Sequence, residues 1–189
     1  MMALNDVALC GRALIRIGVQ PITSFSDGTA ESEIAGAMFA SVRDALLSSY
    51  LWGFASGQVA LNKLMVSPVA DYKNAFELPS DFLRAISAGV GGKGRGLNFR
   101  IASSELHTDS DEAVLSYIYR PNEEDFPTYF DSALIAKLAA EFTIPLTEST
   151  TRAEAMFRLA EQEFARARQI DAQQDTPGRI ERFTLIDVR

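Results

Sequence analysis

Two stretches of helical spacing enclose a central stretch of alternating segments, and this order limits the folds open to the chain. In residues 5–18 apolar side chains recur at intervals of three and four, which is typical of one buried helix face. Asn5 is a suitable N-cap for this helix, and Gly18 is a suitable end. A second helix is predicted from its N-cap, Thr29, to about Tyr50. The chain therefore begins with a pair of helices.

Residues 57–120 follow a different pattern. They contain short segments, several with a two-residue alternation, which Pro, Gly and Asp-Ser turns separate. This pattern predicts a small antiparallel sheet. The segments read QVALNKL, NAFELP, FLRAISA, LNFRIA and AVLSYIYR.

Helical spacing then returns. A third helix is predicted from Thr128 to Pro145, where the proline ends it, and a fourth from about Ser149 to Asp171. One side of the fourth helix is mainly apolar, and the other carries charges of both signs, which favours a solvated face. The apolar side comprises Phe157, Ala160, Phe164, Ala167 and Asp171, and the charged side Arg152, Glu154, Arg158, Glu161, Arg166 and Arg168.

This order of elements predicts an α+β fold in which the two helix pairs pack together as a four-helix bundle. The chain has 189 residues, of which 47% are apolar, enough for one core with an attached subdomain. We expect residues 1–56 and 121–172 to form the helical body and residues 57–120 an inserted small antiparallel β-domain. Residues 173–189 are expected to form an extended C-terminal arm.

The octet GVGGKGRG, residues 89–96, contains five glycines and two cations. A phosphate-binding P-loop needs Lys followed by Ser or Thr at the start of a helix, but Lys93 is followed by Gly94. The segment after Gly96, LNFRIA, does not have a helical pattern either. We therefore expect the octet to be the tip of a long hairpin between two strands. A nucleotide- or nucleic-acid-binding enzyme that uses loop 89–96 remains the alternative.

Residue types that carry catalysis or bind metals are scarce. Cys10 and His107 are the single cysteine and histidine, too few for a zinc site, and His107 is expected in a polar surface turn. We predict no catalytic residues, metal or cofactor. The net charge of −7 disfavours a general nucleic-acid-coating role, and no apolar run approaches the roughly 20 residues that cross a membrane.

The last residues, RIERFTLIDVR, alternate apolar and charged side chains after Pro177-Gly178. One interpretation is a strand that packs back on the chain's own sheet. The other is an arm that adds to a neighbouring subunit or inserts between partner subunits. Its candidate partner-binding residues are Arg179, Ile180, Arg182, Phe183, Leu185 and Ile186.

Taken in order, several motifs resemble the tail tubular protein A and head-to-tail adaptor family of tailed bacteriophages. The resemblance covers nearly the whole chain. Its most specific parts are the LNDVALCGRALIRIG start with Pro21-Ile22, the Trp52-Gly53-Phe54-Ala55 element, the Leu78-Pro79-Ser80-Asp81 turn, and the PLT between the last two helices.

The resemblance implies a structural, non-enzymatic virion protein. Family members form a ring, usually of twelve copies, below the capsid portal, where they extend the channel for the packaged double-stranded DNA. The helices form the ring body, the β-domain faces the downstream tail or nozzle protein, and the C-terminal segment grips the portal. The expected location is the virion neck, with the host cytoplasm during assembly. A monomeric assembly accessory protein is a second alternative.

Roles for four further residues follow from their chemistry. Trp52 and Phe54 are expected to be core anchors that close the helices onto the sheet, because large aromatic side chains bury the most area. Lys93 and Arg95 are candidates for lining the lumen or for contacting the next ring. In a lumen they would meet DNA phosphates without sequence preference. The alternative for both is a solvated, mobile tip.

Overall fold

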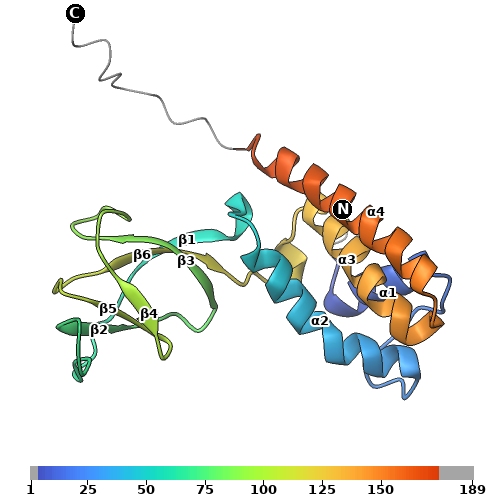
Figure 1. The fold of residues 1–189 in the computed structure, drawn as a ribbon, viewed down its shortest axis with the longest axis horizontal. Coiled ribbons are helices and arrows are strands. Elements are labelled where there is room, and N and C mark those ends of the chain that lie inside the picture. The colour runs from blue at the N-terminus through green and yellow to red at the C-terminus, as the bar shows by residue number, and fades with distance from the viewer. Residues whose placement is uncertain (1–3, 175–189) are drawn as a thin grey trace, which may run out of the picture.

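The computed structural model describes residues 4–174. These residues form an α+β fold with helices at one end and β-strands at the other (Figure 1). Four α-helices and two three-stranded antiparallel sheets account for the regular structure of this range, together with two short 3-10 turns, η1 (Gly53–Ala55) and η2 (Glu123–Asp125). The strands lie between the second and third helices in the sequence, as predicted.

The first two helices begin where the sequence predicts. Helix α1 spans Asp6–Arg16, and the Asn5 side chain accepts a hydrogen bond from the Ala8 N–H at 2.9 Å. Helix α2 spans Ala30–Ser48, and Thr29 and Ser32 form a reciprocal capping box. Both caps satisfy backbone donors that the first helical turn leaves free.

Helices α3 (Thr128–Thr147) and α4 (Thr150–Asp171) follow the strands, and Ser149, near which the fourth helix was predicted to begin, caps α4. The prediction that Pro145 ends α3 is wrong, because the helix continues two residues beyond it. A proline this close to the end removes one intrahelical donor but leaves the following turn able to close. The Glu148 N–H then donates to the Ile144 carbonyl from a left-handed conformation, with φ of 51°, and this ends the helix.

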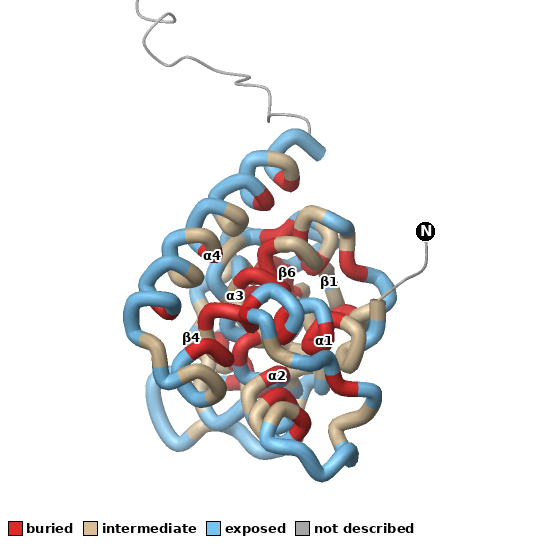
Figure 2. Tube along the Cα trace, turned by 90° about the vertical axis from the view of Figure 1, so that its right-hand side faces the viewer, coloured by how far each residue is buried: buried red, intermediate tan, exposed pale blue. Residues whose placement is uncertain are grey.

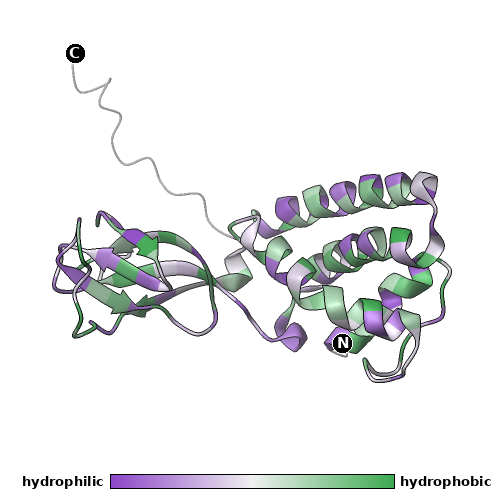
Figure 3. Ribbon diagram, turned by 60° about the horizontal axis from the view of Figure 1, so that its bottom comes forward, coloured by the Kyte–Doolittle hydropathy of each residue, from purple (hydrophilic) through white to green (hydrophobic). Residues whose placement is uncertain are grey.

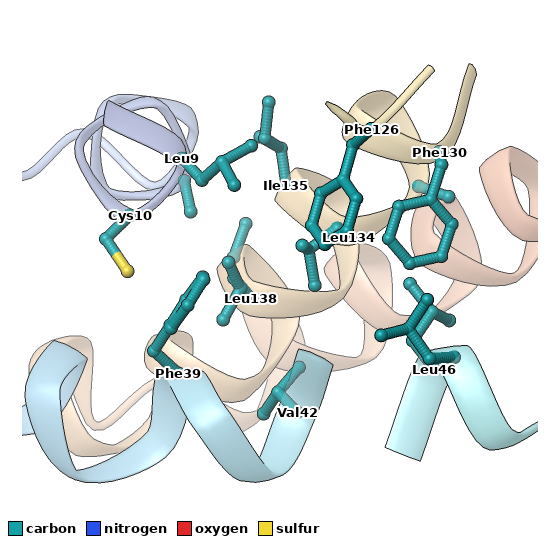
Figure 4. Close-up of a cluster of buried hydrophobic side chains, with 14 of the residues drawn as sticks. Leu9, Cys10, Phe39, Val42, Leu46, Phe126, Phe130, Leu134, Ile135 and Leu138 are labelled. Atoms are coloured by element: carbon teal, nitrogen blue, oxygen red, sulfur yellow. The ribbon is translucent and has the colours of Figure 1, made fainter. Parts of the chain in front are cut away.

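Helix α3 is the central helix, and α1, α2 and α4 all pack against it. Its sequence is apolar on most sides, as expected of a helix enclosed by others, and its buried residues lie inside the helical part (Figure 2). In the core, Leu138 of α3 lies between Leu9 of α1 and Phe39 of α2 (Figure 4).

Helix α4 packs on α3 mainly through small residues. Ala160 and Ala167 are buried, whereas Phe157 and Phe164 are only half-buried. The polar and apolar residues alternate along α4 (Figure 3), and the predicted solvated face is confirmed. All six of its charged residues are exposed: Arg152, Glu154, Arg158, Glu161, Arg166 and Arg168.

The strands form two sheets where a single sheet was predicted. One sheet has the order β1 (Ser56–Ala60), β6 (Val114–Tyr119), β3 (Phe82–Gly89), and the other the order β2 (Asn74–Glu77), β5 (Glu105–Thr108), β4 (Arg100–Ala102). Phe76 and Leu106 of the second sheet pack with Leu115 and Tyr117 of the first. The two sheets therefore share a core that a single small sheet would leave exposed to water.

Strand β5 (Glu105–Thr108) corrects the expectation that His107 lies in a polar surface turn. Leu106 and Thr108 are buried, while Glu105 and His107 alternate with them on the other face. The His107 Nε2 lies 3.0 Å from the Glu105 Oε2. The polar residues of this alternating segment made it resemble a turn in the sequence. Its pairing with β2 and β4 depends on residues far from it in the chain.

The predicted anchoring role of Trp52 and Phe54 is confirmed. Trp52 has no exposed surface, and its indole N–H donates to the Leu46 carbonyl at 3.1 Å. The half-buried Phe54 ring lies 5.0 Å from that of Phe130. Ile118 of β6 belongs to the same buried cluster as these helix residues, so the core of the helical part extends into the central strand of the β1-β6-β3 sheet.

Candidate interaction site

The glycine-rich octet begins at Gly89, the last residue of β3, and continues into the connection to β4, which belongs to a different sheet. The prediction of a hairpin tip is therefore wrong, because the two flanking strands do not pair with each other. The chain does fold back, since the Leu97 N–H donates to the Ala88 carbonyl at 2.9 Å. Gly91 and Gly92 have φ of 60° and 77°, left-handed values that glycine adopts without strain.

Gly94 is the point at which this loop contacts the β1-β6-β3 sheet. Its carbonyl accepts hydrogen bonds from the Ser87 Oγ at 2.6 Å and from the Ser116 Oγ at 3.2 Å. The Gln58 amide in turn donates to the Ser116 Oγ at 3.1 Å. A Cβ on Gly94 would lie 2.4 Å from the Ser116 Oγ, so no other residue fits without displacement. Side chains of β3 and β6 thus hold the middle of the loop, and Gln58 of β1 donates to one of them, Ser116.

Gly89 makes a second close contact at the start of the loop. A Cβ at this position would lie 1.9 Å from the Lys93 carbonyl oxygen and 2.5 Å from the Arg95 backbone nitrogen. The loop backbone therefore passes directly over the end of β3. Because two glycines allow this approach, the loop is seated on the sheet and does not project as a free tip.

Lys93 and Arg95 flank Gly94 and are both exposed. With Gln58, Ser87 and Ser116 they line an open cavity of about 620 Å³. Within residues 4–174 neither cation lies in an ion pair or donates a side-chain hydrogen bond. Most of the lining is polar, and the cationic side chains stand beside hydroxyl and amide groups.

The loop does not have the geometry of a nucleotide-binding loop. A P-loop or a dinucleotide fingerprint places its glycines between a strand and the start of a helix, whose N-terminus receives the phosphate. Here the chain passes from Gly96 through residues 97–99 into β4. The alternative that relied on such a loop therefore lacks its structural element.

The six partner-binding residues predicted in the C-terminal segment, 179–186, lie outside the described residues. The structure does fix the end of α4. The buried Asp171 carboxylate accepts a hydrogen bond from the Gly53 N–H at 3.0 Å and one from the Tyr129 hydroxyl at 2.8 Å. Asp171 thereby joins α4 to the junction between helices and strands.

An apolar group that sequence reasoning missed lies in the connection between β1 and β2. Met65, Val66 and Val69 are among the most exposed large hydrophobic residues of the described chain, with exposed fractions of 102%, 79% and 106%. The short run LMVSPVA is the sequence signal, but it matches neither helical spacing nor strand alternation. Such residues on a surface favour contact with another protein.

The described residues contain two further polar features, an acidic cavity and a buried thiol. An open cavity of about 320 Å³ is lined by Asn5, Asp6 and residues 122–125, which are mostly acidic. Residues 4–174 contain no group of three His, Cys, Asp or Glu side chains placed to hold a metal ion. Burial, followed by the charge of Asp6, raises the pKa of the Cys10 thiol to about 12, so it is protonated at neutral pH.

Comparison with known proteins adds no assignment: no protein-family model matches the chain, and no curated protein matches it. None of the helices described between residues 4 and 174 is long and apolar enough to span a lipid bilayer.

Proposed function

We propose that this chain is a structural adaptor of a tailed bacteriophage, which forms a ring between the capsid portal and the tail and extends the DNA channel. It acts by burying surfaces against other subunits and not by catalysis. In this proposal the four helices form the bundle of the ring body, residues 57–120 face the downstream tail or nozzle protein, and residues 173–189 form the portal-binding arm.

The observation that carries the proposal is the ordered set of adaptor-like motifs. Each motif lies where a helix or strand begins or ends and makes contacts that hold that end in place. Asn5 caps α1, and Trp52 anchors the passage from α2 to β1. In the Leu78–Asp81 turn, the Asp81 carbonyl accepts a hydrogen bond from the Arg120 N–H at 2.9 Å, and its carboxylate accepts one from the Tyr117 hydroxyl at 3.2 Å. Pro145 lies in the last turn of α3. Because the motifs lie at the ends of successive helices and strands, they support a resemblance that covers nearly the whole chain.

The exposed surfaces fit a protein that works by assembly. A closed ring needs two different faces of one chain to meet in each interface. The exposed, mixed-charge face of α4 is suited to one of these faces, because charges of both signs can pair across an interface. The exposed apolar residues Met65, Val66 and Val69 offer a separate contact on the β part, suited to the next component of the tail.

The test is reconstitution with the portal protein encoded by the same phage. Purified chain and portal would be mixed and imaged by electron microscopy, and a ring of twelve copies seated on the portal is expected. A chain that ends at residue 174 should lose most of this binding. The variant Arg16→Ala/Arg158→Ala, which alters exposed residues of α1 and α4, tests the ring interface separately from the arm.

Failure of the full chain to bind the portal under any salt condition would overturn the adaptor proposal. Unchanged binding by the chain that ends at residue 174 would overturn only the role of the arm. The second alternative, a monomeric accessory protein, predicts that the chain stays monomeric in light scattering even when the portal is present.

A further inference from the structure

The loop around Gly94 carries two cations that have no carboxylate partner among the described residues, as do several arginines of α1 and α4. Arg43, Lys63 and Arg120 all lie within ion-pair distance of a carboxylate. Within residues 4–174 Lys93 and Arg95 do not, although the chain carries a net charge of −7. An acidic protein with two neighbouring cations that no carboxylate neutralises presents a local site of positive potential.

The backbone that carries these cations is held in place. The Gly94 carbonyl accepts from Ser87 and Ser116, and the close approach at Gly89 leaves no room for the loop to shift toward the sheet. Fixing the backbone lowers the conformational entropy that binding an anion would otherwise cost. The side chains of Lys93 and Arg95 are therefore attached to a backbone segment whose position is already fixed before an anion binds.

The cavity beside them also contains a neutral donor. The Gln58 amide uses one N–H for the Ser116 hydroxyl, and an amide has two such donors. A polar, open cavity of about 620 Å³ with two cations and an amide donor suits an anion that stays partly hydrated. It does not enclose its ligand as a substrate pocket does.

We propose that Lys93 and Arg95, held by Gly94 on the β1-β6-β3 sheet, bind neighbouring phosphates of a duplex DNA backbone. The identity of the nucleic acid rests on the proposed function, in which duplex DNA passes the adaptor, whereas the site itself rests on the loop geometry. Binding is independent of base sequence, since the groups named recognise phosphate oxygens. It is weak in one chain and gains strength when a ring presents many copies to one DNA molecule.

The test is a titration of the full-length chain with a short mixed-sequence DNA duplex at several salt concentrations. Binding is monitored by the chemical shifts of the backbone amides in NMR spectra. Shifts are expected at residues 58, 87, 93–95 and 116. Two phosphate contacts correspond to a salt slope of about −1.8, so binding should weaken roughly tenfold between 50 and 200 mM salt. Lys93→Ala/Arg95→Ala should remove this slope and the shifts, while Lys73→Ala/Arg100→Ala removes the same charge at exposed positions elsewhere and should keep both.

A second variant separates fixed geometry from charge. Gly94→Ala keeps both cations but places a Cβ 2.4 Å from the Ser116 Oγ, so it should weaken binding severalfold without changing the net charge. Lys93→Glu/Arg95→Glu leaves Gly94 intact and should abolish binding if Gly94→Ala does not fold well enough to measure.

Two outcomes would overturn the inference. In one, the Lys93→Ala/Arg95→Ala variant binds the duplex with an unchanged salt slope. In the other, inorganic phosphate at millimolar concentration saturates the same residues and displaces the duplex, which would make this a site for a small anion. Because these experiments use the chain alone, they can fail while ring formation on the portal succeeds, and the reverse also holds.

Discussion

Arg120 donates two hydrogen bonds to Asp44, from Nε to Oδ1 at 3.0 Å and from Nη2 to Oδ2 at 2.6 Å. This bidentate pair joins the end of β6 to α2. Arg43 donates to the same carboxylate at 2.9 Å and also pairs with Glu123 of η2. We call these four residues the junction cluster, because they lie where the strands meet the helices. They set the position of the strands against α2.

The first prediction concerns Asp44. Burial opposes its ionisation, but hydrogen bonds from Arg120 and Arg43 outweigh burial and lower the pKa of Asp44 below its usual range. A lowered pKa in the folded state contributes stability above about pH 4, which is lost as the pH falls through the folded value. Asp44→Asn should therefore cost about 1–2 kcal/mol at pH 7, and the difference from the wild type should shrink below pH 4.

Urea unfolding at pH 7 and at pH 3 measures this effect. Asp111→Asn is a matched control, since Asp111 pairs with Lys63 but its side chain is 88% exposed, against 26% for Asp44. An exposed ion pair contributes little. If Asp44→Asn and Asp111→Asn lower the free energy of unfolding equally, the junction cluster contributes no more stability than an exposed ion pair.

Asp131 should show the opposite pH dependence. Burial raises the pKa of Asp131 to about 6, although the Arg12 charge opposes this, and its Oδ1 has no hydrogen-bond partner among residues 4–174. The folded chain holds this proton more tightly than the unfolded chain, so stability should fall as the pH rises from about 4 to about 6 and then level off.

Asp131→Asn should remove that decline and raise stability at pH 7.5 by about 1 kcal/mol, a fraction of the full linkage value because the side chain is half-buried. Thermal unfolding across pH 4 to 8 measures the effect. Glu154→Gln, at an exposed site on α4, is the control and should leave the pH profile unchanged. A decline that persists in Asp131→Asn would contradict the assignment.

Trp52 is expected to stabilise the chain through two separable contributions. Trp52→Phe keeps an aromatic ring against Phe130 but removes the indole hydrogen bond to the Leu46 carbonyl, which still accepts from Ser49, so the cost should be about 1 kcal/mol. Trp52→Ala also opens a cavity, which raises the cost to about 3–5 kcal/mol. Denaturant unfolding of both variants tests this, and equal losses would mean that the hydrogen bond carries the whole effect.

Asp171→Ala should leave the Gly53 N–H and the Tyr129 hydroxyl without their acceptor, at a cost of about 2–3 kcal/mol. Burial, and then the hydrogen bond and charge of Asp171, raise the pKa of Tyr129. The variant should therefore lower the pKa of Tyr129 toward its usual range, which absorbance in alkaline titration detects. A Tyr129 titration that does not change would show that burial alone causes the shift.

Helix positions in this chain follow from local rules. Asn5, Thr29 and Ser149 cap helices through hydrogen bonds to backbone groups three residues away, so a short window of sequence contains both partners. Trp52 was predictable as a core anchor for a similar reason, since its area alone favours burial. Pro145 shows the limit, because ending or continuing a helix there depends on how the next turn closes.

The strands needed information from farther along the chain. Strand β5 pairs with β2 about thirty residues away, and the separation of the strands into two sheets depends on which apolar faces meet around Phe76 and Leu106. The same holds for the candidate site. The glycines and cations of the octet are visible in the sequence. The hydrogen bond from Ser116 to Gly94, and the one from Gln58 to Ser116, are visible only in the structure.

The sequence by itself thus determined the helices, their caps and the presence of an intervening β region, because those depend on propensities and contacts within a few residues. The tertiary structure alone decided which strands pair, where the glycine-rich loop contacts the β1-β6-β3 sheet, and which residues form the junction cluster. Each of these joins residues distant in the chain, and only the packing of two apolar cores brings them within hydrogen-bond distance.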